Sequence, residues 1–155
     1  MAEHQYRMAI LVQTIADPGI NIKRHDLVLV RCIEIALVHD MAEAIVGDLT
    51  PDCGISKEEK MKMEKCAFDK ITVLSGIPSL LEAWNEYEQD TTPEACLVKD
   101  IDKYEFLLQL VEYEKKHNIR MDDFWRNASY KIRHEEVKKW FVELENERNM
   151  LHISQ

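Results

Sequence analysis

The chain has 155 residues and a mass of 18.2 kDa; 46% of the residues are hydrophobic and 32% are charged, with four glycines and four prolines. This balance excludes collagen-like, low-complexity and disordered chains and predicts one compact domain over residues 1–155. The net charge of −9 disfavours binding to a nucleic acid polymer or to an anionic membrane surface, because both require clustered cations.

Helical periodicity dominates the first half of the chain. Apolar side chains recur at helical spacing in the first segment, with His4 one turn before them: Met8, Leu11, Val12 and Ile15. Asp17-Pro18-Gly19 should end this helix, and Asp26 is the expected N-cap of a nearly all-apolar helix over 27–38. Gly47 and Pro51 break the chain, so a loop is expected up to Ile55.

The second half reads as further helices. Ser56 and Glu59 form a capping box that opens a helix to about Leu74, and another follows over 79–88. The longest helix starts at Thr92-Pro93-Glu94 and ends at Asn118. Two more are expected, over 121–129 and over 134–150. The predicted fold class is therefore all-α, a helical bundle without a sheet.

The four cysteines are scattered without a C-x-x-C pair. The sequence therefore has neither a zinc-knuckle motif nor a redox-pair motif. We expect reduced, mostly buried thiols in an intracellular protein. No uncharged apolar run is long enough to span a membrane. The expected location is cytoplasmic.

The pair His39-Asp40 ends the most apolar helix, where adjacent polar side chains are costly unless something satisfies them. A divalent metal would satisfy both, and imidazole and carboxylate ligands suit manganese, iron, cobalt or zinc. A dipeptide alone is weak evidence, since the same pair at His25-Asp26 is explained by helix capping. The alternative is a core histidine beside a helix-end carboxylate.

The residues after this pair add to the case for chemistry. Glu43 lies one turn beyond His39 if the helix continues or re-forms, and a carboxylate there can accept a proton from an activated water. Asp48, on the loop after Gly47, can face the same cavity.

Several segments together, in this order and spacing, resemble the HD-domain metal-dependent phosphohydrolases, and among them the 5′-deoxynucleotidase branch. The similar segments are Glu3-His4-Gln5-Tyr6-Arg7-Met8-Ala9, Ala36-Leu37-Val38-His39-Asp40-Met41-Ala42-Glu43, Val46-Gly47-Asp48, Glu58-Glu59-Lys60, Trp84-Asn85-Glu86-Tyr87-Glu88, Val98-Lys99 through Asp102, and Glu143-Leu144-Glu145 through Arg148. The resemblance covers nearly the whole chain.

This resemblance implies an HD-domain helical bundle with one divalent ion, either manganese, cobalt, magnesium, zinc or iron. It also implies hydrolysis of deoxyribonucleoside 5′-monophosphates to deoxynucleoside and phosphate, and a homodimer. By position, the implied metal ligands are His4, His39, Asp40 and Asp102. Glu43 would position or deprotonate the attacking water, and Asp48 would contact the sugar or assist the leaving oxygen.

The fourth ligand is open on periodicity alone. Asp100 lies nearer the centre of the apolar stripe of the long helix, whereas Asp102 falls on a more polar stripe with Val98, Glu105 and Gln109. The family pattern, a lysine three residues before the ligand, selects Asp102.

Relatives carry a segment with an arginine and a tryptophan before the first ligand, whereas only three residues precede His4 here. Candidate substitutes for its phosphate contacts are Arg7, Lys60 and Lys99, each of which also reads as an ordinary solvated helix residue. Two alternatives to the deoxynucleotidase therefore stand: a non-catalytic helical interaction module that retains a metal site, and a phosphohydrolase that acts on another nucleotide.

Overall fold

The computed structural model describes residues 2–15, 29–50, 53–129 and 132–153. Over these ranges every regular element is a helix, which confirms the all-α prediction. The helices are α1 (Ala2–Ile15), α2 (Leu29–Val38), α3 (Glu43–Val46), α4 (Lys57–Ser75), α5 (Ser79–Gln89), α6 (Pro93–His117), α7 (Asp122–Ser129) and α8 (Glu135–Ile153). The predicted stop at Asp17-Pro18-Gly19, the caps around His25-Asp26 and the break at Pro51 lie outside the described residues.

The helix ends follow local chemistry that is legible in the sequence. At the start of α4, the Ser56 side chain accepts from the Glu59 amide while the Glu59 carboxylate accepts from the Ser56 amide, so the predicted capping box is confirmed. Thr92 caps α6, with Pro93 as its first residue, and Asn118 closes it in the left-handed conformation. Gly47, at φ 78° and ψ 171°, turns the chain away after α3 in a conformation that side chains disfavour.

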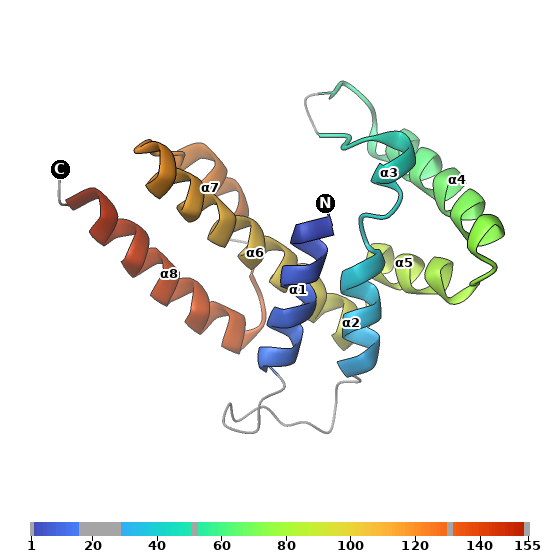
Figure 1. Cartoon of the computed structure of the whole chain (residues 1–155), viewed down its shortest axis with the longest axis horizontal. Coiled ribbons are helices and arrows are strands. Elements are labelled where there is room, and N and C mark those ends of the chain that lie inside the picture. Colours follow the sequence, from blue (N-terminus) through green and yellow to red (C-terminus); the bar gives the residue numbers. More distant parts are fainter. Residues whose placement is uncertain (1, 16–28, 51–52, 130–131, 154–155) are drawn as a thin grey trace.

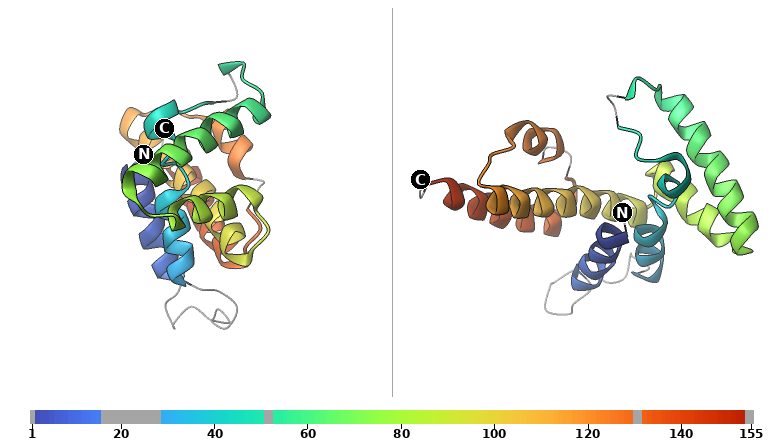
Figure 2. Two further views of the ribbon diagram at one scale, coloured as in Figure 1. Left: turned by 90° about the vertical axis from the view of Figure 1, so that its right-hand side faces the viewer. Right: turned by 45° about the horizontal axis from the view of Figure 1, so that its top comes forward.

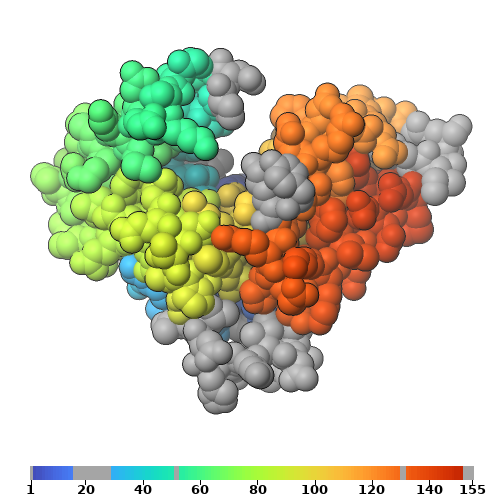
Figure 3. Space-filling model, turned by 180° about the vertical axis from the view of Figure 1, so that it is seen from behind, coloured from blue at the N-terminus to red at the C-terminus, as the bar shows by residue number. Residues whose placement is uncertain are grey.

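The long helix α6 is the spine of the molecule (Figure 1). α1 and α2 lie side by side and both pack against α6, while α5 packs against α2 and α6. α7 and α8 pack on α6 towards its other end, as the right-hand view of Figure 2 shows. From behind, the space-filling view places α4 and α5 on one side and α7 and α8 on the other, with α6 between them (Figure 3).

One hydrophobic core joins these helices. Its largest fully buried apolar side chains come from five helices: Phe68, Met8, Ile15, Ile35, Leu97, Ile101, Leu107 and Val137 are among them. The stripe of α1 that carries Met8, Val12 and Ile15 faces this core, and His4 stands one turn before it. Packing of α1 and α2 against α6 therefore brings the polar residues at these helix ends to one place.

Burial of the cysteines differs from the prediction. All four are free, but only Cys32 is buried, Cys96 is half-buried, and Cys53 and Cys66 are exposed. The expectation of mostly buried thiols is wrong because Cys53 lies between helices and Cys66 lies on the solvent side of α4, beside the buried Ala67 and Phe68.

Among the described helices, none combines the length and the apolar character needed to traverse a bilayer.

The capping box yields a prediction about folding. Ser56→Ala removes the side-chain acceptor for the Glu59 amide, so the free energy of unfolding should fall by about 1 kcal/mol. Lys62→Ala, at an exposed position inside the same helix, is the matched control and should change stability by less than about 0.5 kcal/mol. Urea denaturation measures both values, and equal stability of the two variants would contradict the role of the cap.

Candidate metal centre

The predicted metal ligands come from three helices. His4 lies in the first turn of α1, His39 and Asp40 follow the last residue of α2, and Asp102 lies in α6. Nearly one hundred residues separate His4 from Asp102, and the packing of α1 and α2 on α6 closes that distance. The four side chains thus meet because the three helices share the core.

Their polar atoms form a tight cluster. Nε2 of His4 lies 3.2 Å from Oδ1 of Asp102 and 3.9 Å from Oδ2 of Asp40. Nε2 of His39 lies 3.1 Å from Oδ2 of Asp40 and 3.9 Å from Oδ1 of Asp102. One ligand atom from each of His4, His39 and Asp102 can be chosen so that all three lie within 4.8 Å of one another. This spacing suits two imidazole nitrogens and carboxylate oxygens around one cation.

His39 gives the sharpest test of whether a metal fits. Its Nδ1 donates to the carbonyl oxygen of Ala36 at 2.9 Å, and because a carbonyl only accepts, Nδ1 carries the proton. In the neutral ring Nε2 is then the lone-pair nitrogen; it is buried, faces two carboxylates and makes no hydrogen bond. A buried acceptor turned towards other acceptors is costly unless a cation lies between them. The donor set therefore fits a divalent metal.

The charges of the cluster point the same way. Burial lowers the pKa of His4, but the carboxylates of Asp102 and Glu105 outweigh it and raise that pKa to about 10. Burial raises the pKa of Asp102, yet its hydrogen bond with His4 prevails and holds the pKa below the ordinary value. The Tyr87 hydroxyl donates to Oδ2 of Asp102 at 2.9 Å, and burial keeps the pKa of Tyr87 well above its usual range. The carboxylates of this cluster thus favour a positive charge among them, and we call the four predicted ligand side chains the cation-seeking cluster.

Asp100 has a different place and task. It is buried on another side of α6, where Oδ2 accepts the backbone amides of Arg133 and His134, the latter at 2.7 Å. Its Oδ1 lies 3.2 Å from Nε of Arg133. Asp100 thereby ties the segment before α8 to the spine, and Asp102, two residues on, is the one that faces His4.

A pocket of about 390 Å³ opens beside the cluster. Its lining comes from the ends of α2 and α3 and from α4, α5 and α6: His39, Asp40, Glu43, Lys57, Lys60, Met61, Glu64, Tyr87, Glu88, Lys99 and Asp102. Lys60 and Lys99, two of the three candidate phosphate contacts, line this pocket. Nζ of Lys60 donates to the carbonyl of Leu49 at 3.1 Å, and Nζ of Lys99 sits 4.6 Å from the centre of the Tyr87 ring.

Three charged lining residues escaped the sequence analysis, namely Lys57, Glu64 and Glu88. A signal for the first two exists: Lys57, Lys60, Met61 and Glu64 have the i, i+3, i+4, i+7 spacing of one helix face. Trp84 and Tyr87 lie one turn apart on α5 but make different contacts. Trp84 stacks on Phe68, with ring centres 4.9 Å apart, whereas Tyr87 packs on His39 and lines the pocket.

Glu43 begins the short helix α3 and lines the pocket, as the sequence suggested. Burial, with the nearby charges of Asp40 and Asp48, raises the pKa of Glu43 to about 7. A carboxylate with that pKa is suited to accept a proton near neutral pH. Asp48 is exposed beyond Gly47 and acts on Glu43 through its charge, but it does not line the pocket.

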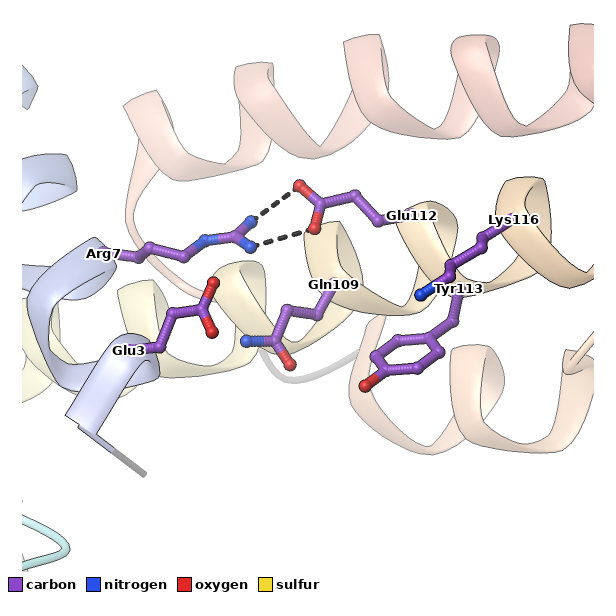
Figure 4. Close-up of a pocket in the computed structure, with 6 residues that line it drawn as sticks. All are labelled: Glu3, Arg7, Gln109, Glu112, Tyr113 and Lys116. Carbon is purple, nitrogen blue, oxygen red and sulfur yellow. Dashed lines mark hydrogen bonds and ion pairs between the residues drawn. The ribbon is translucent and has the colours of Figure 1, made fainter.

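Arg7 is not brought to this pocket. Its guanidinium reaches from α1 to α6, where it makes a two-point ion pair with Glu112 at 2.9 Å (Figure 4). Its Nε also lies 2.8 Å from Oε1 of Glu105. It lines instead a separate hollow with Glu3, Gln109 and Lys116. The Arg7 guanidinium, a candidate phosphate contact from the sequence, is therefore already paired with two carboxylates.

Comparison with known proteins decides the family. The sequence model of the protein family described as HD domain matches residues 1–145 of this chain. The chain belongs to the HD domain family. Among similar proteins, 5′-deoxynucleotidase hdd1 of Schizosaccharomyces pombe is 42% identical, with 99% of this chain and 78% of that protein covered. 5′-Deoxynucleotidase HDDC2 of Homo sapiens is 40% identical, with 96% of this chain and 72% of that protein covered.

A solved structure places this HD domain among its relatives in three dimensions. HD domain-containing protein YGK1 of Saccharomyces cerevisiae superimposes with a TM-score of 0.71 at 35% identity, covering 97% of this chain and 77% of that chain. The predicted HD-domain helical bundle is thereby confirmed.

The two aspartates of α6 yield a prediction with opposite outcomes. Asp102→Ala removes a carboxylate from the cluster and should weaken Mn²⁺ binding by roughly 100-fold or more, since even partners outside the ligand set are worth about 10–100-fold. Asp100→Ala should leave that affinity unchanged and lower the free energy of unfolding by about 1–3 kcal/mol, because two backbone amides lose their acceptor.

Calorimetric titration with Mn²⁺ and urea denaturation measure the two effects. Loss of metal binding in Asp100→Ala, with binding kept in Asp102→Ala, would reverse our placement of the two residues.

Proposed function

We propose that this HD domain is a metal-dependent 5′-deoxynucleotidase, which hydrolyses deoxyribonucleoside 5′-monophosphates to deoxynucleoside and phosphate. The observation that carries the proposal is the cation-seeking cluster on the wall of a lysine-bearing pocket of about 390 Å³. The relatives described above, named 5′-deoxynucleotidases, support the same reaction.

In this proposal His4, His39, Asp40 and Asp102 hold one divalent ion, and its identity is among manganese, cobalt, magnesium, zinc and iron. Bound there, the ion supplies Lewis-acid chemistry that polarises the phosphate and activates a water molecule. The unpaired Nε2 of His39 and the carboxylate charge around His4 support this ligand set.

The chain's own residues divide the remaining work. Glu43 accepts the proton of the attacking water, a task that its raised pKa supports. Lys60 and Lys99 line the pocket, with Lys57 beside them, and their ammonium groups offset the phosphate charge in an acidic protein. Asp48 is exposed outside the lining of the pocket, and its proposed contact with the sugar or the leaving oxygen rests on the family resemblance.

Arg7 has no part in this scheme, because its guanidinium is paired with Glu105 and Glu112.

We further propose that the enzyme is cytoplasmic, acts on a small molecule and forms a homodimer. Exposed aromatic side chains on α6 and α7, among them Phe106, Tyr113 and Phe124, support a contact surface for a second copy.

The proposed base yields the functional test. With Mn²⁺ or Co²⁺, the chain should release phosphate from deoxyribonucleoside 5′-monophosphates, and Glu43→Ala should lower kcat by roughly 100-fold or more because proton transfer is lost. The same variant should retain its Mn²⁺ affinity, since Glu43 is outside the ligand set. Glu58→Ala, which removes an exposed carboxylate from the first turn of α4, is the control and should retain activity.

Phosphate release measured across monophosphates, triphosphates and cyclic nucleotides separates this function from the alternatives. A chain that binds Mn²⁺ but releases no phosphate would favour the interaction module. Full activity of Glu43→Ala would exclude Glu43 as the proton acceptor.

A further inference from the structure

Behind the proposed ligand His4 lies a buried carboxylate that the reaction scheme does not use. Glu105, in α6, is fully buried, and its Oε2 accepts a hydrogen bond from Nδ1 of His4. A buried carboxylate is costly unless it is paired. Its partners here are His4 and Arg7, both from α1.

The pairing depends on matched helical spacing on two helices. Asp102 and Glu105 are three residues apart on α6, so both reach the imidazole of His4, at Nε2 and Nδ1 respectively. Arg7 is three residues beyond His4 on α1, and its Nε lies 2.8 Å from Oε1 of Glu105. The outer end of the guanidinium pairs with Glu112, two turns further along α6 (Figure 4). A continuous polar chain thus runs from the surface to His4.

This arrangement determines which nitrogen of His4 can bind a cation. Nδ1 of His4 donates to the Glu105 carboxylate, so Nε2, which faces Asp40 and Asp102, is the nitrogen that becomes free to bind a cation once it gives up its proton. His39 likewise donates a hydrogen bond from Nδ1, but its acceptor is the neutral carbonyl oxygen of Ala36. A carboxylate behind an imidazole both orients the ring and raises the basicity of the opposite nitrogen.

We propose that Glu105, neutralised and held by Arg7, is a positioning residue that fixes the orientation and tautomer of His4 for metal binding. This rests on the metal site of the proposed function and adds a residue behind its ligands. It also gives Arg7 a role: the arginine pairs with the buried Glu105 carboxylate and holds it in place.

A purely structural role for Glu105, as an ion pair that fastens α1 to α6, is the alternative, and the chain contains a matched control. Glu114 is a second buried carboxylate of α6, and both its oxygens accept from Arg148 of α8 at 2.8 Å. Replacing either carboxylate should lower stability, whereas only Glu105 contacts a proposed ligand.

The experiment compares Glu105→Gln, Glu105→Met and Glu114→Gln in the full chain, with Mn²⁺ titrated calorimetrically and folding checked by circular dichroism. Glu105→Met should weaken the Mn²⁺ affinity by roughly 10–100-fold, and Glu105→Gln by less, because its amide oxygen still accepts one hydrogen bond. Glu114→Gln should bind Mn²⁺ like the parent. If Glu105→Met does not fold, the nearly isosteric Glu105→Gln decides.

Proton NMR of the cobalt-loaded protein adds a signature that an ion pair between helices would not give. The parent should show a slowly exchanging, paramagnetically shifted imidazole N–H of His4, and this signal should exchange faster in Glu105→Gln and be unaltered in Glu114→Gln. Parent-like Mn²⁺ affinity in both folded Glu105 variants would overturn the positioning role and leave the proposed function intact. Failure of the parent itself to bind Mn²⁺ would overturn both.

Discussion

A buried imidazole nitrogen that finds no donor is the constraint around which this site is organised. The Nδ1 proton of His39 goes to the Ala36 carbonyl, so Nε2 faces the carboxylates of Asp40 and Asp102 as one acceptor among others. Such an arrangement is costly unless a positive charge lies among these groups, either as a proton on an imidazole or as a metal ion. The carboxylates of Asp102 and Glu105 raise the pKa of His4 to about 10, so they favour a positive charge at this place.

The fold creates this site by packing α1, α2 and α6 against one another. Apolar stripes on α1 and α2 bury themselves against α6, and the polar residues just beyond those stripes have to converge. The division of labour along α6 follows from helical geometry: Asp100 holds the segment before α8, while Asp102 and Glu105 turn towards α1. One helix thereby builds both the scaffold and the site.

Much of this was accessible from the sequence, and the misses have physical reasons. Caps at Ser56, Thr92 and Asn118 act locally, so the ends of α4 and α6 could be predicted. Periodicity alone left Asp100 and Asp102 open, because a carboxylate tied to backbone amides is as buried as an apolar residue. Partners distant in sequence were not accessible: Arg7 reads as a free cation until Glu112, over one hundred residues away, is placed beside it. The polar stripe containing Asp102, Glu105 and Gln109 was visible, but it does not reveal which helix it faces.

The most direct test of the central claim is a crystal structure of the chain grown with Mn²⁺ and measured at the manganese absorption edge. The account predicts one anomalous peak between α1, α2 and α6, about 2.0–2.3 Å from Nε2 of both His4 and His39 and bound by carboxylate oxygens of Asp40 and Asp102. A peak located elsewhere, or the two imidazoles turned away from a shared ion, would contradict it.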